Sequence, residues 1–92
     1  MRFEWDEAKN LKNIKKHGVD FNDVKEIFNY PMIRSLDTRE NYGEDRWIGI
    51  GWIATILGVV VYVEKYDDVI RFISARKASK HEVKYYGQRI KN

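Results

Sequence analysis

The sequence lacks cysteine, which excludes disulfide bonds and thiolate metal sites. Only two residues are histidines, and two imidazoles without thiolates or suitably spaced carboxylates do not make a zinc site. No glycine-rich phosphate loop and no nucleophile motif occurs. The sequence therefore gives no support to a metal, nucleotide or covalent-nucleophile enzyme as the first hypothesis.

A long hydrophobic segment is also missing. The first ten residues, MRFEWDEAKN, do not contain the apolar region of a secretory signal. The long uncharged stretch at residues 48–63 is shorter than the ~20 residues that a membrane helix needs, and three glycines interrupt it. We therefore expect a cytoplasmic protein without membrane contact, and we interpret this stretch as two paired strands.

The hydrophobic and aromatic content predicts a packed core in one domain. Hydrophobic residues make up 43% of the 92 residues and aromatic residues 14%, a composition that disordered chains do not show. A chain of this length suits a single domain, which we place at residues 1–92. The core of such a domain has little room for an internal pocket.

The charge is unevenly distributed along the chain. The net charge is +3, but residues 65–92 carry eight Lys/Arg against three Asp/Glu, whereas residues 18–45 carry three against seven. This asymmetry predicts one face for an anion and another for solvent or a basic partner. A mixed solvated surface is the alternative.

Capping signals predict two N-terminal helices. Asp6 suits the N-cap of a helix that ends at His17, and a second helix starts at Asp20 and stops at Pro31. Three residues at helical spacing form the expected apolar stripe of the first helix: Ala8, Leu11 and Ile14.

Alternating apolar residues predict a sheet in the remainder of the chain. The strand candidates are residues 32–36, 46–54, 55–63 and 69–75, with a possible short strand at 2–5. Because their connections are short, we expect the four long candidates to form an antiparallel meander. A final helix follows, with the apolar stripe Val83, Tyr86 and Ile90. The predicted fold is a compact α+β domain.

The junction between the last strand and the last helix is the strongest functional signal. Its basic residues are Arg71, Arg76, Lys77, Lys80 and Lys84. A strand that passes into a helix fixes such charges in space and suits a phosphodiester. On an ideal strand, Arg76 shares a face with Ile70 and Phe72.

Several candidate functional residues can also be explained by a structural role. Glu82 opposes the basic residues, but it also occupies the N3 position of a capping box that starts at Ser79. His17 ends a helix, where an imidazolium interacts well with the dipole, or it acts as a base or phosphate contact. Arg46 is either part of the site or paired with a nearby carboxylate.

RNA cleavage fits this limited set of groups. The ribose 2′-hydroxyl is the nucleophile, so the protein has to align it and stabilise a dianionic phosphorane. About two or three Arg/Lys side chains and one proton-transfer group can do this without a metal ion.

One set of positions spans most of the chain: Trp5-Asp6, Lys9, Asn13, Lys16-His17-Gly18-Val19, Phe21, Gly43-Glu44-Asp45-Arg46, Ser74-Ala75-Arg76-Lys77-Ala78, Glu82 and Tyr85. With these residues, nearly the whole chain resembles the BrnT toxins. The resemblance implies a RelE-like ribonuclease toxin of a type II toxin–antitoxin pair. It also implies a partner, the antitoxin BrnA, whose ribbon-helix-helix region binds operator DNA and autorepresses the operon.

The resemblance guides the assignment of site residues. We assign Arg46 and Arg76 to transition-state stabilisation, and His17 and Tyr86 are the candidates for proton transfer. The RNA-contact candidates are Lys9, Lys16, Arg71, Lys77 and Lys80. The predicted function is that of a metal-independent endoribonuclease toxin without cofactor. The rival hypothesis is a non-catalytic basic module that binds nucleic acid or docks an antitoxin.

Overall fold

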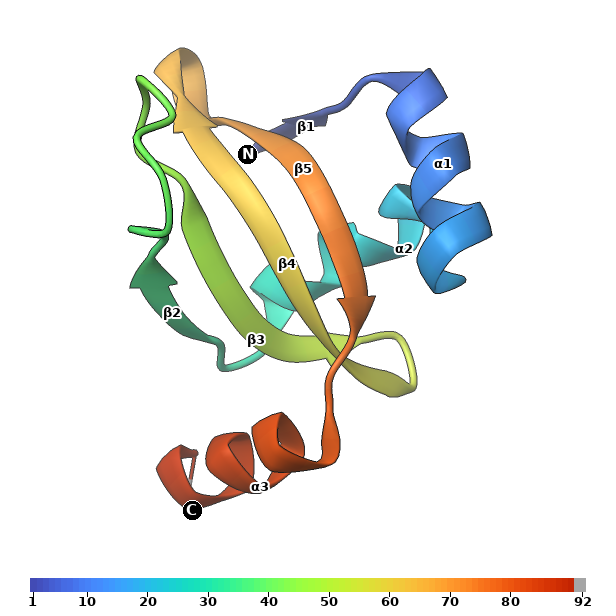
Figure 1. The fold of residues 1–92 in the computed structure, drawn as a ribbon, viewed down its shortest axis with the longest axis vertical. Helices are drawn as coiled ribbons and strands as arrows, with labels where there is room; N and C mark the ends of the chain where they lie inside the picture. Colours follow the sequence, from blue (N-terminus) through green and yellow to red (C-terminus); the bar gives the residue numbers. More distant parts are fainter. Residues whose placement is uncertain (91–92) are drawn as a thin grey trace.

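The chain folds around a five-stranded sheet with strand order β1-β5-β4-β3-β2 (Figure 1). The structure is a computed structural model and describes residues 1–90. The elements are β1 Arg2–Glu4, α1 Glu7–His17, α2 Phe21–Val24, η1 Lys25–Asn29, β2 Ile33–Leu36, β3 Trp47–Ile53, β4 Ile56–Lys65, η2 Tyr66–Asp68, β5 Val69–Lys77 and α3 Lys80–Arg89. Within these residues, no helix has the length and apolar character needed to cross a membrane.

The sheet is mixed. Strands β2 to β5 form the predicted antiparallel meander. The short N-terminal strand β1 also exists, but it pairs in parallel with β5, so the antiparallel description holds for four of the five strands. Most of the chain separates these two strands, and a pairing over that distance leaves no signal in local periodicity.

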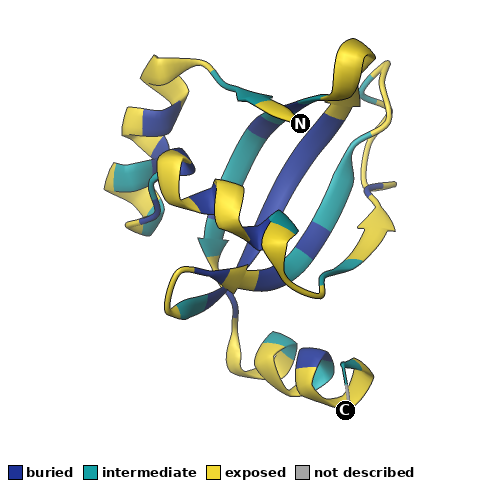
Figure 2. Ribbon diagram, turned by 180° about the vertical axis from the view of Figure 1, so that it is seen from behind, coloured by how far each residue is buried: buried dark blue, intermediate teal, exposed yellow. Residues whose placement is uncertain are grey.

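Helices cover the two faces of the sheet unequally. We call the face against α1, α2 and η1 the helical face; its core contains Phe21, Val24 and Ile27 packed on Tyr62 and Phe72. Figure 1 shows α1 beside β5, with α2 behind the sheet. The central strand β4 is buried along most of its length (Figure 2).

The other face, which we call the open face, is covered by α3 at one end only. There, Ala78 and Tyr86 pack on Leu57 and Val59 and make a second, smaller core. In Figure 1, α3 lies beyond the ends of β3, β4 and β5, which leaves the middle of the open face uncovered by helices. The candidate site lies on this uncovered part.

A β-bulge interrupts β5. The partner of Tyr62 is Phe72, whereas the partner of the preceding Val61 is Ser74, so Ile73 is an extra residue on β5. Such an insertion inverts the alternation of side chains beyond it.

The bulge places Arg76 on the face opposite to the predicted one. Ile70, Phe72 and Ala75 all belong to the core of the helical face, although alternation on an ideal strand would separate Ala75 from the other two. Arg76 therefore points to the open face, where it lines a cavity. The prediction that Arg76 shares a face with Ile70 and Phe72 is wrong, because it assumed unbroken pleating.

The buried side of α1 is polar. The predicted helix from the Asp6 cap to His17 is confirmed, but its buried residues are Asn10 and Asn13. Leu11 is 62% exposed, so the predicted apolar stripe is wrong at this position, as it is at the exposed Ala8. The helix lies beside the edge of β5, where amide side chains can satisfy backbone groups.

The second helix is tighter than predicted. Phe21–Val24 is α-helical, but the chain continues as a 3-10 helix over Lys25–Asn29.

In the last helix the capping box of Ser79 and Glu82 is confirmed. Its apolar stripe is shorter than predicted, because Val83 is 48% exposed.

Candidate functional site

A cavity of about 230 Å³ lies on the open face. Three separate elements supply its polar lining: His17 ends α1, Arg39 lies in the loop between β2 and β3, and Ser74 and Arg76 belong to β5. Its apolar floor consists of Ile48, Val59 and Val61. The fold thus brings a histidine and two arginines from distant parts of the chain to one cavity.

A second hollow of about 210 Å³ extends this surface along α1. It shares His17 and Ser74 with the cavity, so the two are continuous. Its cations come from successive turns of α1: Lys9, Lys12 and Lys16. We call the combined surface, lined by these lysines, His17, Ser74, Arg39 and Arg76, the basic groove. Its shape and charge suit a strand of phosphates.

Glu82 holds Arg76 by a two-pronged ion pair. The Arg76 Nη1 and Nη2 atoms donate to the two Glu82 carboxylate oxygens at 2.7 and 2.9 Å. The Ser79 N–H also donates to Glu82, at 2.8 Å. These contacts, chiefly the one with Arg76, lower the pKa of Glu82 to about 2. Glu82 is therefore ionised at neutral pH, and it links the cap of α3 to the arginine of the groove.

Asp37 holds Arg39 in a similar way. The Arg39 Nε and Nη2 atoms donate to the two Asp37 oxygens, both at 2.8 Å. The Asp37 side chain is fully buried, whereas the Arg39 side chain is 66% exposed. Hydrogen bonding to Arg39 holds the pKa of Asp37 well below its usual range.

Arg39 was not among the residues predicted from the sequence. Its position depends on the path of an irregular loop, which periodicity does not reveal. The only available signal was the spacing of two residues between Asp37 and Arg39, which allows a local ion pair.

The two arginines of the cavity are close enough to interact. The pKa of Arg76 is raised, chiefly by its hydrogen bond with Glu82, while burial and the positive charge of Arg39 oppose the rise. Each guanidinium has its own carboxylate, which allows two like charges to share one cavity.

Asn13 fixes α1 to β5 beside the groove. Its amide accepts from the Ala75 N–H at 3.1 Å and donates to the Ala75 carbonyl at 2.8 Å. It also donates to the Val19 carbonyl at 2.9 Å. Because Ala75 lies between Ser74 and Arg76, this side chain sets the position of β5 relative to His17.

These features can be compared with known proteins. A family model described as "Ribonuclease toxin, BrnT, of type II toxin-antitoxin system" matches residues 5–82. The chain belongs to the BrnT family. A solved structure described as the Brucella abortus ribonuclease toxin, BrnT, is similar, with 29% sequence identity and a TM-score of 0.66 over 87% of this chain and 99% of that chain. The comparison with curated proteins gives no match. The predicted family and α+β fold are thus confirmed.

Two of the residues assigned to catalysis lie outside the basic groove of this BrnT family member. The Tyr86 hydroxyl donates to the Pro31 carbonyl at 2.6 Å, within the small core under α3. Arg46 lies next to Glu44, at 3.5 Å from Nε, and over the Tyr42 ring, at 4.1 Å.

The register also separates Arg46 from Arg76. Arg46 precedes Trp47, whose partner is Tyr62, so it continues toward Val63, the partner of Arg71. Arg76 instead pairs with Val59, four residues before Val63 on β4. The two arginines face the same side but lie in different rows of the sheet.

The remaining predicted RNA contacts are divided in the same way. Lys9 and Lys16 line the groove. The lining of both hollows leaves out Arg71, Lys77 and Lys80. Lys77 and Lys80 are exposed at the end of β5 and the start of α3.

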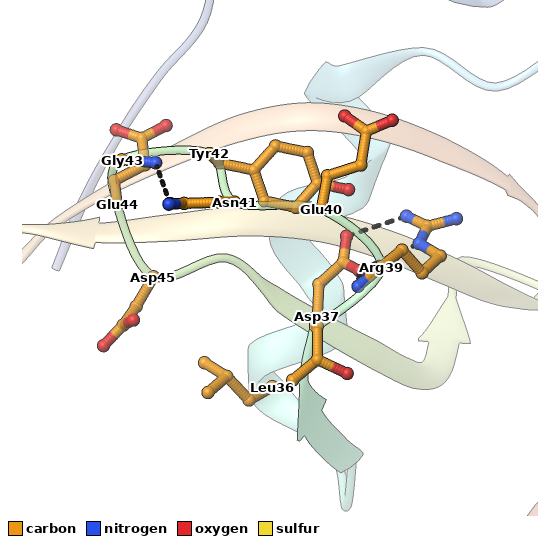
Figure 3. Close-up of a pocket in the computed structure, with 10 residues that line it drawn as sticks. Leu36, Asp37, Arg39, Glu40, Asn41, Tyr42, Gly43, Glu44 and Asp45 are labelled. Atoms are coloured by element: carbon orange, nitrogen blue, oxygen red, sulfur yellow. Dashed lines mark hydrogen bonds and ion pairs between the residues drawn. The ribbon is translucent and has the colours of Figure 1, made fainter.

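A larger open hollow, of about 730 Å³, lies in the loop between β2 and β3 (Figure 3). A single continuous segment, residues 36–45, lines it. Four of these residues are acidic and one is basic, so the hollow repels a phosphodiester.

Among residues 1–90, no three or more His, Asp and Glu side chains are grouped to share a metal ion.

Proposed function

We propose that this BrnT family member is a metal-independent endoribonuclease and that its basic groove holds the scissile phosphate. One observation carries this proposal: the cavity brings His17 from α1 and Arg76 from β5 together, with the lysines of α1 in continuation. A guanidinium, an imidazole and a row of ammonium groups are the groups that phosphodiester cleavage by an internal nucleophile requires.

In the proposed reaction the 2′-oxygen attacks the adjacent phosphorus while a base takes its proton. The bond from phosphorus to the 5′-oxygen then breaks, and the leaving oxygen receives a proton, which gives a cyclic phosphate and a 5′-hydroxyl. Arg76 stabilises the charge that develops on the equatorial oxygens. His17 is the proton-transfer group of this proposal, because its imidazole lines the same cavity as Arg76.

The surrounding cations bind the rest of the RNA chain. Lys9 and Lys16 contact phosphates on the α1 side of the reacting one. Arg46 and Arg71 face the same side of the sheet in another row, so we assign them to a flanking phosphate. Lys77 and Lys80 extend this contact beyond the cavity. Tyr86 receives a packing role, because its hydroxyl already donates to Pro31.

The partner of a type II toxin is its cognate antitoxin. We propose an antitoxin of the BrnA type, whose ribbon-helix-helix region carries the complex to operator DNA. An acidic segment that covers the basic groove would exclude RNA by occupying the same cations.

The proposed function is tested by incubating RNA with purified, antitoxin-free protein in the presence and absence of EDTA. We expect equal cleavage rates, with cyclic phosphate ends on the products. Loss of cleavage in EDTA would contradict the metal-independent mechanism. RNA binding without cleavage in either condition would favour the non-catalytic module.

A further inference from the structure

We propose that Arg39 is a second catalytic arginine, which contacts the reacting phosphate together with Arg76, and that buried Asp37 is its positioning residue. This proposal rests on the proposed ribonuclease function and adds a group that neither the charge clusters nor the strand pattern of the sequence indicated. It means that the loop between β2 and β3 completes the site.

The first observation is the place of Arg39 in the cavity. Arg39 lines the same hollow as His17 and Arg76, although it comes from an irregular loop. The positive charge of Arg39 also opposes the rise in the pKa of Arg76, in line with their shared cavity. Each guanidinium is paired with its own carboxylate outside the cavity, but the cavity lining itself contains no carboxylate, so an anion between the two guanidiniums would gain attraction from both.

The second observation is the orientation of the guanidinium. Asp37 engages Nε and Nη2 of Arg39, and a guanidinium has five N–H donors, so about three donors lie outside this ion pair. Figure 3 shows the Arg39 side chain facing Asp37 and extending away from Gly43, Glu44 and Asp45. The donors that Asp37 leaves unoccupied therefore belong to a fork of fixed orientation.

The third observation is the contrast in burial within this ion pair. Asp37 is fully buried, but the Arg39 side chain is 66% exposed at the cavity. The backbone N–H of Arg39 also donates to the Asp37 carboxylate, at 3.2 Å. The loop thus closes around its own carboxylate and displays the arginine, as a positioning device requires.

A purely structural ion pair is the competing explanation, and activity measurements on folded variants distinguish the two. We expect Arg39→Ala to lower kcat/KM for RNA cleavage by about 10²–10³, as for the loss of one transition-state donor. Arg39→Lys keeps a charge for Asp37, and thus the fold, but loses the fork, so we expect a loss of at least about tenfold.

Asp37→Asn tests the positioning role. We expect this variant to lower kcat with less effect on KM, because the guanidinium remains but is no longer fixed. In the Arg39→Ala background the same change should have no further effect on kcat, since Asp37 acts through Arg39. A purely structural ion pair would instead lower the melting temperature in the wild-type background and leave the kcat of the folded variant unchanged.

Arg34→Ala is the matched control. Arg34 also pairs with a carboxylate, Glu64, but it lies on the helical side of the sheet beside Phe28 and Tyr62. Its loss should leave cleavage unchanged.

The outcomes separate this proposal from the proposed function. Wild-type kcat/KM in folded Arg39→Ala and Arg39→Lys, with activity lost in Arg76→Ala, would overturn the role of Arg39 and leave the proposed function intact. Wild-type cleavage in all three variants would contradict both. Loss of activity in Arg39→Ala with a further loss on adding Asp37→Asn would remove the positioning role of Asp37.

Discussion

At the residue scale, each of the two arginines of the groove is held in place by a carboxylate. Arg76 forms a two-pronged pair with Glu82, and its Nη1 also donates to the Lys77 carbonyl at 3.3 Å. A planar fork held in this way cannot be replaced by an ammonium group, which offers a single point of charge. The proposed cleavage reaction therefore depends on guanidinium geometry as well as on charge.

Arg76→Lys tests this dependence. We expect the folded variant to lose about 10²–10³ in kcat/KM, because one bidentate donor to the phosphorane is missing. The measurement is single-turnover cleavage of RNA. Arg89→Lys, whose guanidinium lies over the Tyr85 ring in α3, is the control with expected wild-type activity. Equal rates for Arg76→Lys and wild type would exclude Arg76 from the transition state.

Glu82→Gln tests the electrostatic part of the same pair. The folded pKa of Glu82 is lowered from 4.5 to about 2, so its ionised form stabilises the folded state fully above pH 4.5, and this stabilisation is lost as the pH falls through 2. We expect the variant to be less stable by roughly 2 kcal/mol at pH 7, allowing for solvent screening of the partly exposed pair.

The measurement is urea unfolding of both proteins at several values between pH 7 and pH 2. The difference in free energy of unfolding should shrink toward the acid end. Glu26→Gln, at an exposed glutamate of η1, is the control and should stay within about 0.5 kcal/mol of wild type. A gap for Glu82→Gln that does not change with pH would show that the carboxylate charge contributes nothing.

At the element scale, α1 and β5 are joined by an amide instead of by apolar contact alone. Strand β1 pairs with β5 only from Val69 to Arg71, so the later part of this edge needs other partners. Asn13 supplies them at Ala75, one residue before Arg76. The helix that carries His17 and the strand that carries Arg76 thus share one hydrogen-bonded contact.

Asn13→Ala should therefore destabilise the fold. The change leaves two groups of Ala75 without partners, at about 1–3 kcal/mol for each buried group, so we expect a loss of roughly 2–6 kcal/mol in the free energy of unfolding. Denaturant unfolding provides the measurement. Asn22→Ala, at an exposed asparagine whose amide donates to Asp20, is the control with a much smaller expected change. A loss for Asn13→Ala that matched the control would show that water replaces these bonds.

The sequence predicted the elements well because their signals are local. Caps at Asp6 and Ser79 marked helix starts, and alternation marked the strands of the meander. The parallel β1–β5 pair, the bulge at Ile73 and the buried Asn13 depend on contacts between distant segments, so local patterns did not reveal them.

The contrast between local signals and distant contacts also explains which site residues the sequence predicted. Basic charge marked Arg76, and the end of a helix marked His17; the structure places both in one cavity. Arg39 was missed because only the folded loop brings it there. Arg46 and Arg76 were assigned together, and only the register showed that they lie in different rows.

At the scale of the whole molecule, positive and negative surfaces adjoin at the loop of Arg39. The basic groove carries the α1 lysines, and the hollow of residues 36–45 carries four acidic residues. A partner with both an acidic and a basic segment would be oriented by these two surfaces.

The association with the antitoxin tests this charge distribution. We expect the on-rate to fall as salt rises, and the double variant Lys9→Glu, Lys16→Glu to lower it by about tenfold or more at low salt. Stopped-flow mixing at two salt concentrations measures both effects. The double variant Lys25→Glu, Lys84→Glu, at exposed residues of η1 and α3 outside the groove, is the control for an equal change of net charge. A salt-independent on-rate that the double variant does not change would place the antitoxin on another surface.

The extra residue in β5 has a consequence for how such sequences are aligned. If the same residues paired without the bulge, Ile73 would lie opposite Val61 and Arg76 would turn toward the helical core, so a slip of one residue would act on this strand as a frameshift acts on a message. Every amino acid of the site would still be encoded, yet the groove would lose its guanidinium. Deletion of Ile73, by contrast, would leave Ser74, Ala75 and Arg76 opposite their present partners. The register of this strand is therefore information about the proposed site that a catalogue of substitutions does not contain.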